Sequence, residues 1–142
     1  MKIYLIGSLR NSKVSELGVL LRAEGHVVFD DWVAAGPEAD DYWQKYEQNR
    51  GRTYIEALSG FAARHIFEYD RKHLLEADVG VLILPAGKSA HLELGVLIGR
   101  SKKTYILLEE EPERFEVMYC FADGVFNNKE DLLSELNRAC QK

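Results

Sequence analysis

Unbroken apolar runs alternate with segments of helical periodicity along this chain. Residues 2–7 and 79–84 form runs of the kind found in strands that are covered on both faces. Shorter runs predict three more strands at 27–29, 104–108 and 124–126. Apolar spacing predicts helices at 14–24, 53–77 with a break near 59–60, 89–100, 115–122 and 129–140. This alternation predicts an α/β domain, with an open, mostly parallel five-stranded sheet and helices on both faces.

The stretch at 77–99 is the centre of this pattern. Its strand ends in a turn of small residues at 85–87, and the following helix is expected to begin near Ser89. If Ser89 caps this helix, the capping-box position is a leucine, so Glu93 is not used by the cap. The helix dipole is expected to keep Glu93 ionised, and such a carboxylate suits a nucleophile that attacks electron-poor carbon. On this pattern alone, a partly exposed surface glutamate is the alternative.

A second group of polar residues follows the first strand. Gly7, Ser8 and Arg10 form a strand-to-helix turn whose donors suit a phosphate or a hydroxyl-rich ligand. Strands one and three are expected to be the central pair, and ligands of such sheets bind beyond the carboxyl ends of the strands. The loops at 7–11 and 85–93 are therefore expected to define the site. Tyr4 lies within the first strand, where a buried phenol needs a hydrogen-bond partner.

Residues 30–52 interrupt the regular alternation. The segment carries two tryptophans and two tyrosines among many charges, and part of it, 42–49, is compatible with a short helix. A connection this long in a compact domain is typical of a lid, a binding loop or a partner contact. We expect 32–52 to be a lid or an interface segment, whose aromatic side chains stack on a nucleobase or form a hydrophobic lid contact.

Composition narrows the range of functions. The 142 residues, 46% apolar and 29% charged, are expected to form one folded domain over 1–142. A net charge of −5 with no basic stripe argues against a nucleic-acid partner, and no apolar stretch predicts a membrane span. Cys120 and Cys140 lack metal-ligand spacing and are interpreted as reduced thiols of a cytoplasmic protein. His91 and Glu93 lie about 200° apart around a helix, so we expect no metal site, and no cofactor.

Four short motifs together resemble the nucleoside 2-deoxyribosyltransferase family, which includes the 2′-deoxynucleoside 5′-phosphate N-hydrolases. They are Y-L-I-G-S-L-R at 4–10, E-Y-D at 68–70, A-D-V at 77–79 and H-L-E-L-G at 91–95. The resemblance implies a flavodoxin-like fold, a homodimer or higher homo-oligomer, and cleavage of the N-glycosidic bond of a nucleoside or nucleotide. It implies that Glu93 is the nucleophile, that Asp70 is the general acid and base, and that Tyr4 holds Glu93. The sugar would pass to another base or to water.

The resemblance leaves the 5′ group of the substrate open. Ser8 and Arg10 resemble the pair that holds a 5′-phosphate in the hydrolases, and Gly7, Gly87, Ser89 and His91 are expected to line the same substrate site. Gly87 stands where the transferases carry an aspartate, and Glu116 stands where the hydrolases carry a serine. The alternative function is a non-catalytic nucleotide-binding or sensing module. A phosphoribohydrolase is disfavoured because the chain has P-A-G-K-S-A in place of P-G-G-x-G-T.

Overall fold

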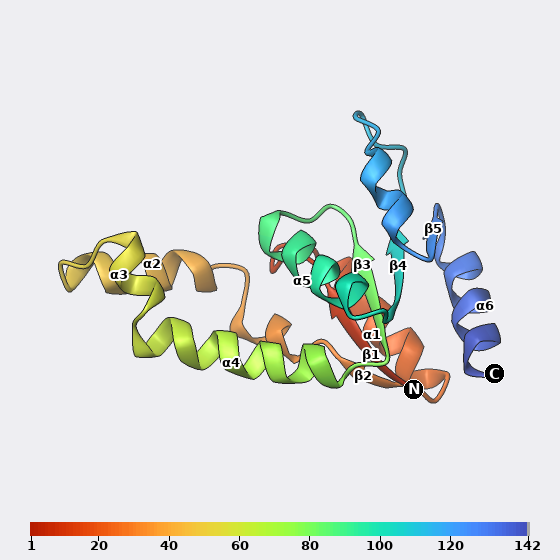
Figure 1. Ribbon diagram of the computed structural model, residues 1–142, viewed down its shortest axis with the longest axis horizontal. Coiled ribbons are helices and arrows are strands. Elements are labelled where there is room, and N and C mark those ends of the chain that lie inside the picture. Colours follow the sequence, from red (N-terminus) through yellow and green to blue (C-terminus); the bar gives the residue numbers. More distant parts are fainter. Residues whose placement is uncertain (142) are drawn as a thin grey trace.

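A computed structural model describes residues 1–141 and contains a five-stranded, fully parallel sheet (Figure 1). The strands are β1 (Lys2–Ile6), β2 (Val27–Phe29), β3 (Val79–Ile83), β4 (Lys103–Leu107) and β5 (Gly124–Phe126). Their order is β2-β1-β3-β4-β5, so β1 and β3 are neighbours at the point where the order reverses. The α/β class, the five strands and the central pair expected from the sequence are confirmed.

Within residues 1–141, six α-helices and two 3₁₀-helices connect and flank these strands. The α-helices are α1 (Lys13–Ala23), α2 (Ala39–Asn49), α3 (Tyr54–Leu58), α4 (Phe61–Glu76), α5 (Lys88–Gly99) and α6 (Lys129–Cys140). The 3₁₀-helices are η1 (Asp31–Ala35) and η2 (Val117–Phe121). The predicted break near 59–60 separates α3 from α4. The predicted cap of α5 is wrong, because Gly87 rather than Ser89 occupies the N-cap position.

Two apolar layers enclose the sheet, because successive side chains of a strand point to opposite faces. Ile3 and Leu5 of β1 pack with α1 and α6, whereas Tyr4 and Ile6 pack with α4 and α5. Gly80 of β3 allows α5 to pack closely on the second face, since a Cβ at this position would collide with the Leu97 side chain. Tyr4 is a buried member of the apolar layer beneath α4 and α5.

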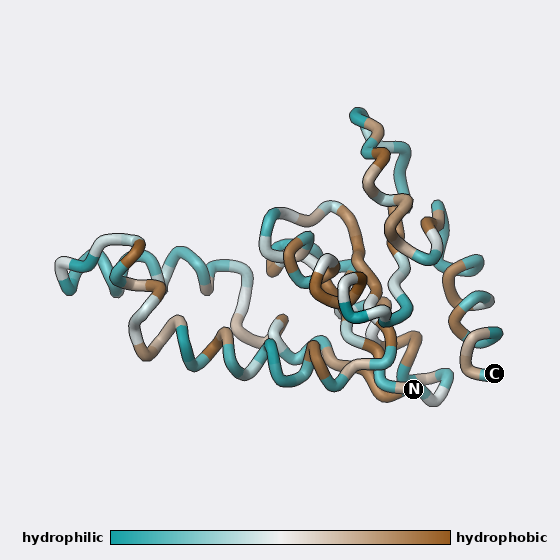
Figure 2. Tube along the Cα trace, viewed as in Figure 1, coloured by the Kyte–Doolittle hydropathy of each residue, from teal (hydrophilic) through white to brown (hydrophobic). Residues whose placement is uncertain are grey.

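Helices α2 and α3 and the first half of α4 project away from the sheet as an arm (Figure 1). The segment at 30–52 is mostly helical, as η1 and α2, so the expectation of a helix at 42–49 is confirmed and extended. Hydrophobic residues recur along the arm (Figure 2), and the Phe61 side chain at the start of α4 is 94% exposed. Of α4, only Leu74 is fully buried, because the helix leaves the sheet towards its N-terminus.

Trp32 belongs to the body of the protein rather than to the arm. Its indole nitrogen donates a hydrogen bond to the carbonyl oxygen of Leu5, at 2.9 Å, and its ring packs against both apolar layers. Strand β2 pairs with β1 only as far as Tyr4. The indole therefore satisfies a backbone carbonyl that lies beyond the end of the shorter strand.

Three further observations concern the described residues, 1–141. None of the helices in this range has both the length and the apolarity of a membrane span. No cluster of histidine, cysteine, aspartate and glutamate in the same range is arranged to hold a metal ion. Cys120 and Cys140 are both free thiols and both exposed.

Candidate active site

A tyrosine–glutamate pair lies on the α5 side of the central strands. The Tyr4 hydroxyl donates a hydrogen bond to Oε2 of Glu93, at 2.7 Å, across a sequence separation of 89 residues. Tyr4 is the third residue of β1 and is 1% exposed, so the phenol has the buried partner that the sequence analysis called for. Burial and the neighbouring Glu93 carboxylate both raise the pKa of Tyr4, so the phenol remains a proton donor. The hydrogen bond fixes one carboxylate oxygen of Glu93 and leaves the other free.

The protonation state of Glu93 differs from the one expected from the sequence. Burial raises the pKa of Glu93 to about 7, while the hydrogen bond from Tyr4 lowers it and the nearby Asp70 raises it further. Glu93 is the sixth residue of α5, beyond the first turn in which the helix dipole acts. Desolvation therefore outweighs the dipole, and the expectation of a carboxylate held ionised by the helix start is wrong.

Asp70 reaches the same region from α4. Its charge acts on both Tyr4 and Glu93, which places all three polar groups in one neighbourhood. Burial raises the pKa of Asp70, and His73 opposes this increase. Two carboxyl groups with raised pKa values next to a buried phenol form the arrangement that acid–base and nucleophilic catalysis require.

Aromatic rings of residues that were not predicted to belong to the site pack beside these groups. Phe29 stacks on Tyr4, with ring centroids 5.0 Å apart, and on His73, with centroids 4.2 Å apart. Tyr69 packs edge-on against His73. The predicted helix at 53–77 contains both Tyr69 and His73, but nothing in the sequence indicated that Phe29 would join these rings to Tyr4.

The loop after β1 contacts the loop after β3, as expected. Asn11 donates from its side chain to the carbonyl oxygens of Ile83 and Pro85, at 3.4 Å each. The Ser8 hydroxyl accepts a hydrogen bond from the backbone N–H of Arg10, at 3.1 Å. A Cβ on Gly7 would lie 2.8 Å from the Val14 side chain, so this glycine is required for the packing of α1.

Charged residues of the β1–α1 loop are already paired. The Arg10 guanidinium lies 3.3 Å from the carboxylate of Asp41, at the start of α2, and both side chains are exposed. The Lys13 ammonium lies 2.7 Å from the carboxylate of Glu109, just after β4. Two acidic residues from distant parts of the chain therefore face Arg10, which was predicted to bind a ligand, and Lys13 at the start of α1.

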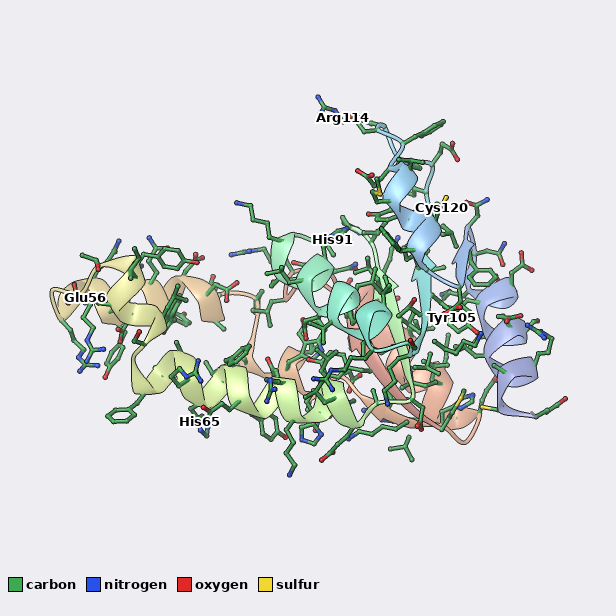
Figure 3. All side chains as sticks on the ribbon, viewed as in Figure 1. Glu56, His65, His91, Tyr105, Arg114 and Cys120 are labelled. Carbon is green, nitrogen blue, oxygen red and sulfur yellow. The ribbon has the colours of Figure 1, made fainter. Side chains whose placement is uncertain are left out.

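The first turn of α5 holds the remaining predicted residues. The His91 ring lies between α5 and η2 (Figure 3), with one nitrogen 2.7 Å from the Gly87 carbonyl oxygen and the other 2.9 Å from the Tyr119 hydroxyl. A carbonyl only accepts, so the Gly87 contact puts the ring proton on Nδ1, and Nε2 accepts from Tyr119. Ser89 is exposed, and the position of a Cβ on Gly87 is open space. His91 thus connects the start of α5 to η2.

The fold is shared with proteins of known structure. A 2-deoxyribosyltransferase from the psychrotolerant bacterium Bacillus psychrosaccharolyticus matches with a TM-score of 0.64 and 20% identity, over 93% of this chain and 90% of that chain. The CMP N-glycosidase BcmB of Clostridium botulinum matches with a TM-score of 0.56 and 14% identity, over 96% and 99% of the two chains. A conserved protein from Enterococcus faecalis V583 matches with a TM-score of 0.65 and 16% identity, over 98% of each chain.

The chain has the fold of a 2-deoxyribosyltransferase. The flavodoxin-like architecture expected from the four short motifs is therefore confirmed, as is the resemblance at the level of the fold. No protein-family model and no curated protein sequence matches this chain. At 14–20% identity, these likenesses show a shared fold.

Proposed function

We propose that this protein cleaves the N-glycosidic bond of a nucleoside through Glu93. The observation that carries the proposal is the 2.7 Å hydrogen bond from the buried Tyr4 to Glu93, with Asp70 close to both. A second half-buried carboxyl group, that of Asp70, supplies the acid–base partner that glycosidic cleavage needs. The names of the two neighbouring enzymes, a deoxyribosyltransferase and an N-glycosidase, agree with this chemistry.

The first step forms a covalent intermediate. The free carboxylate oxygen of Glu93 attacks the anomeric carbon of the sugar, and a carbon–oxygen ester bond forms as the carbon–nitrogen bond breaks. The bonding electron pair leaves with the nitrogen of the base, and Asp70 transfers its proton to that base. Tyr4 donates to the other oxygen of Glu93 and so holds the carboxylate in the orientation needed for attack.

The second step releases the sugar. Asp70, now ionised, takes a proton from water or from a second base as that acceptor attacks the anomeric carbon. The ester bond breaks and its electron pair returns to the Glu93 carboxylate. The proton taken from the acceptor restores the protonated form of Asp70. Two displacements at one carbon give net retention of configuration, as in retaining glycosidases. Proton transfer of this kind typically accounts for about 10²–10⁴ in rate.

The raised pKa values are compatible with this division of roles. In the free enzyme the carboxyl pair shares a proton near neutral pH, because burial raises the pKa of Glu93 to about 7 and also raises that of Asp70. Tyr4 hydrogen-bonds Glu93 and so favours the ionised form of that carboxyl. The larger rise is that of Glu93, so the proton of the pair lies on Glu93 in the free enzyme, and the first step requires its transfer to Asp70.

The decisive experiment is a base-release assay on a broad panel of substrates. Deoxynucleosides, ribonucleosides and their 5′-monophosphates are incubated with the protein, with and without a second free base, and products are separated by liquid chromatography. We expect release or exchange of the base for at least one class, with retention at the anomeric carbon. Ligand binding without turnover of any substrate would instead support the nucleotide-sensing alternative.

The charges at the β1–α1 loop support a substrate with a free 5′-hydroxyl group. Arg10 and Lys13 each face a carboxylate, from Asp41 and Glu109 respectively. The hydrogen bond with Glu109 raises the pKa of Lys13, and the nearby Glu110 raises it further. A phosphate dianion at this loop would have to compete with these carboxylates for the two cations, whereas a neutral hydroxyl group would not.

We therefore expect a higher kcat/KM for deoxynucleosides than for the matching 5′-monophosphates. Changing Asp41→Asn removes the carboxylate that faces Arg10 and leaves the guanidinium free for a phosphate. The KM for the monophosphate should fall about tenfold, which is the scale of one charge-assisted contact, while the KM for the nucleoside changes little. Asp40→Asn is the matched control, because no ion pair joins the neighbouring Asp40 to Arg10. A wild-type preference for the monophosphate would contradict this assignment.

Exposed apolar side chains on α4 and α5 support a homodimer or a larger homo-oligomer. Leu92 and Val96 of α5 are 73% and 42% exposed, and Gly95 and Gly99 leave open space beside them. The neighbouring α4 exposes Ile66 and Phe67 in addition to Phe61.

A second copy of this chain, packed on these helices about a two-fold axis, would bury the same surface on both subunits. It would also cover the two helices that carry Asp70 and Glu93.

Analytical ultracentrifugation should report a dimer or larger assembly for the wild-type protein. Val96→Asp places a charge within the apolar surface of α5 and should shift the sedimentation coefficient to that of a monomer. Val19→Asp is the matched control, because Val19 is 65% exposed on α1, which covers the opposite face of the sheet. A monomeric wild-type protein, or equal effects of the two variants, would rule out an interface on α5.

A further inference from the structure

The arm contains a cavity that the chemistry described above does not use. It has a volume of about 450 Å³ and lies between α2 and α3, at the far end of the arm (Figure 1). Small-molecule sites in proteins typically have volumes of about 300–1,000 Å³ and combine apolar walls with a few polar groups. Trp43 and Glu47 of α2 line this cavity, together with Arg52 and Tyr54 from the next segment of the chain.

Trp43 and Glu47 each have a polar side-chain atom that is buried at this cavity. Neither the indole Nε1 of Trp43 nor Oε2 of Glu47 has a hydrogen-bond partner within residues 1–141. Glu47 as a whole is only 2% exposed. Buried polar atoms without a partner are rare, because each loses its hydrogen bonds to water and gains none in return. Two such atoms in the lining of one cavity point to a ligand that pairs with them.

The two atoms differ in hydrogen-bonding character. Trp43 and Glu47 are four positions apart on α2, which puts their side chains on the same face of the helix, one turn apart. An indole N–H only donates a hydrogen bond, whereas a carboxylate oxygen only accepts one. A ligand that satisfies both atoms must therefore carry an acceptor and a donor on neighbouring positions of one edge.

The charges around the cavity favour an uncharged ligand. Oε1 of Glu47 lies 3.5 Å from the Arg50 guanidinium, and Oε2 lies 3.6 Å from that of Arg52, which is too far for a hydrogen bond. The two arginines thus balance the charges of Glu47 and of Asp40, another residue of the lining. A cationic ligand would face the arginines, and an anionic ligand would face the two carboxylates.

The aromatic residues of the lining favour a flat ligand. The side chains of Trp43 and Tyr54 both border the cavity, and aromatic rings of this kind stack on flat heterocycles. An uncharged, flat heterocycle with a donor beside an acceptor is the description of a free nucleobase. Adenine and cytosine, for example, carry an amino group next to a ring nitrogen.

We propose that the cavity between α2 and α3 binds a free nucleobase. Glu47 accepts a hydrogen bond from the amino group of the base, and Trp43 donates one to the adjacent ring nitrogen. This site goes beyond the function proposed above, because no part of it uses Glu93. A free base is also what that reaction releases, but binding to the arm does not depend on the reaction.

Nuclear magnetic resonance tests the proposal on the wild-type protein, without any sugar donor. The chain has two tryptophans, so its spectrum has two indole N–H signals. Trp32 is the internal control: it already donates to the Leu5 carbonyl oxygen, and its ring lies 3.8 Å from the position of a Cβ on Gly7, in the β1–α1 loop. With added adenine, we expect the Trp43 proton signal to move downfield and to saturate below about 1 mM, while the Trp32 signal stays in place.

Two results of this titration would overturn the proposal. Movement of the Trp32 signal alone would place the base at the β1–α1 loop instead of the arm. No movement of either signal would mean that water, or a contact between Trp43 and Glu47, satisfies the two atoms. Neither result bears on the proposed function, which the base-release assay tests separately.

A second ligand and a variant test the assigned contacts. N6,N6-dimethyladenine keeps the ring and its acceptors but lacks the amino donor, so its affinity at the Trp43 signal should be about tenfold lower than that of adenine. Glu47→Leu removes the acceptor and should weaken adenine binding by a similar factor. Tyr46→Phe, at an exposed position of α2, is the matched control and should bind like wild type. Equal affinities of the two ligands for the wild-type protein would overturn the proposal even if Glu47→Leu fails to fold.

Discussion

Glu93→Gln is expected to reduce base release by about 10³-fold or more, because an amide cannot form the ester with the sugar. Glutamine keeps nearly the same shape and still accepts the hydrogen bond that Tyr4 donates at 2.7 Å, so substrate binding should persist. Wild-type protein quenched during turnover should carry a sugar on Glu93 that mass spectrometry detects, and the variant should not. Activity close to wild type in Glu93→Gln would remove Glu93 as the nucleophile.

The same variant should also change the stability of the protein in a pH-dependent manner. Burial raises the pKa of Glu93 from its ordinary 4.5 to about 7, so the folded state binds more protons than the unfolded state between these values. The stabilisation is complete below about pH 4.5 and is lost as pH rises through about 7, which corresponds to about 3 kcal/mol. Above pH 7 the wild-type protein carries a half-buried charge on Glu93 that glutamine removes.

Thermal unfolding at two pH values checks this expectation. At pH 9 Glu93→Gln should exceed wild type in free energy of unfolding by about 2–3 kcal/mol, whereas at pH 5 the two proteins should differ little. Glu113→Gln, at an exposed position between β4 and η2, is the control and should show no such divergence with pH. A variant that is less stable than wild type at pH 9 would mean that the ionised Glu93 is compensated by contacts beyond Tyr4.

Asp70→Asn is expected to lower kcat by about 10²–10⁴, the range typical of general acid–base catalysis. The loss should depend on the leaving group, because only a base that needs a proton requires the acid. With a p-nitrophenyl deoxyriboside, whose leaving group is stable as an anion, formation of the glycosyl-enzyme should remain close to the wild-type rate.

Pre-steady-state measurement separates the effect of Asp70→Asn on formation of the glycosyl-enzyme from its effect on breakdown of that intermediate. Release of p-nitrophenol in the first turnover reports formation of the ester, and the following steady state reports its breakdown, for which Asp70 is the base. We expect a normal burst followed by slow turnover in Asp70→Asn. Glu68→Gln, an exposed change on the same helix, is the control. An equally slow burst with this substrate would show that Asp70 acts on Glu93 or on folding rather than on the leaving base.

Much of the fold could be predicted because strands buried on both faces need apolar residues at nearly every position. Residues 27–29 and 124–126 become β2 and β5 with the predicted bounds, and the break near 59–60 separates α3 from α4. The arm was predicted only in part, as a helix within 30–52. Helical spacing reports that a segment is a helix, but not whether that helix packs on the sheet or leaves it, and α4 does both along its length.

The site could be predicted as residue types but not as electrostatics. Glu93 stood out as a carboxylate in an apolar helix, and Tyr4 as a buried phenol that needed a partner. Whether Glu93 is ionised depends on its desolvation, which the sequence does not contain, and the helix-dipole reasoning gave the wrong sign. Arg10 looked free for a ligand because its partner, Asp41, is 31 residues away in the chain.

The amino-acid sequence by itself determined the order of strands and helices, the pairing of central strands, and the presence of unusual carboxyl and phenol groups. These depend on local periodicity and on the cost of burying polar groups, both of which can be read along the chain. Only the tertiary structure decided that Tyr4 donates to Glu93 and that Asp70 lies beside them. Hydrogen bonds and charge interactions act over a few ångströms in space, so they depend on which distant segments the fold brings together.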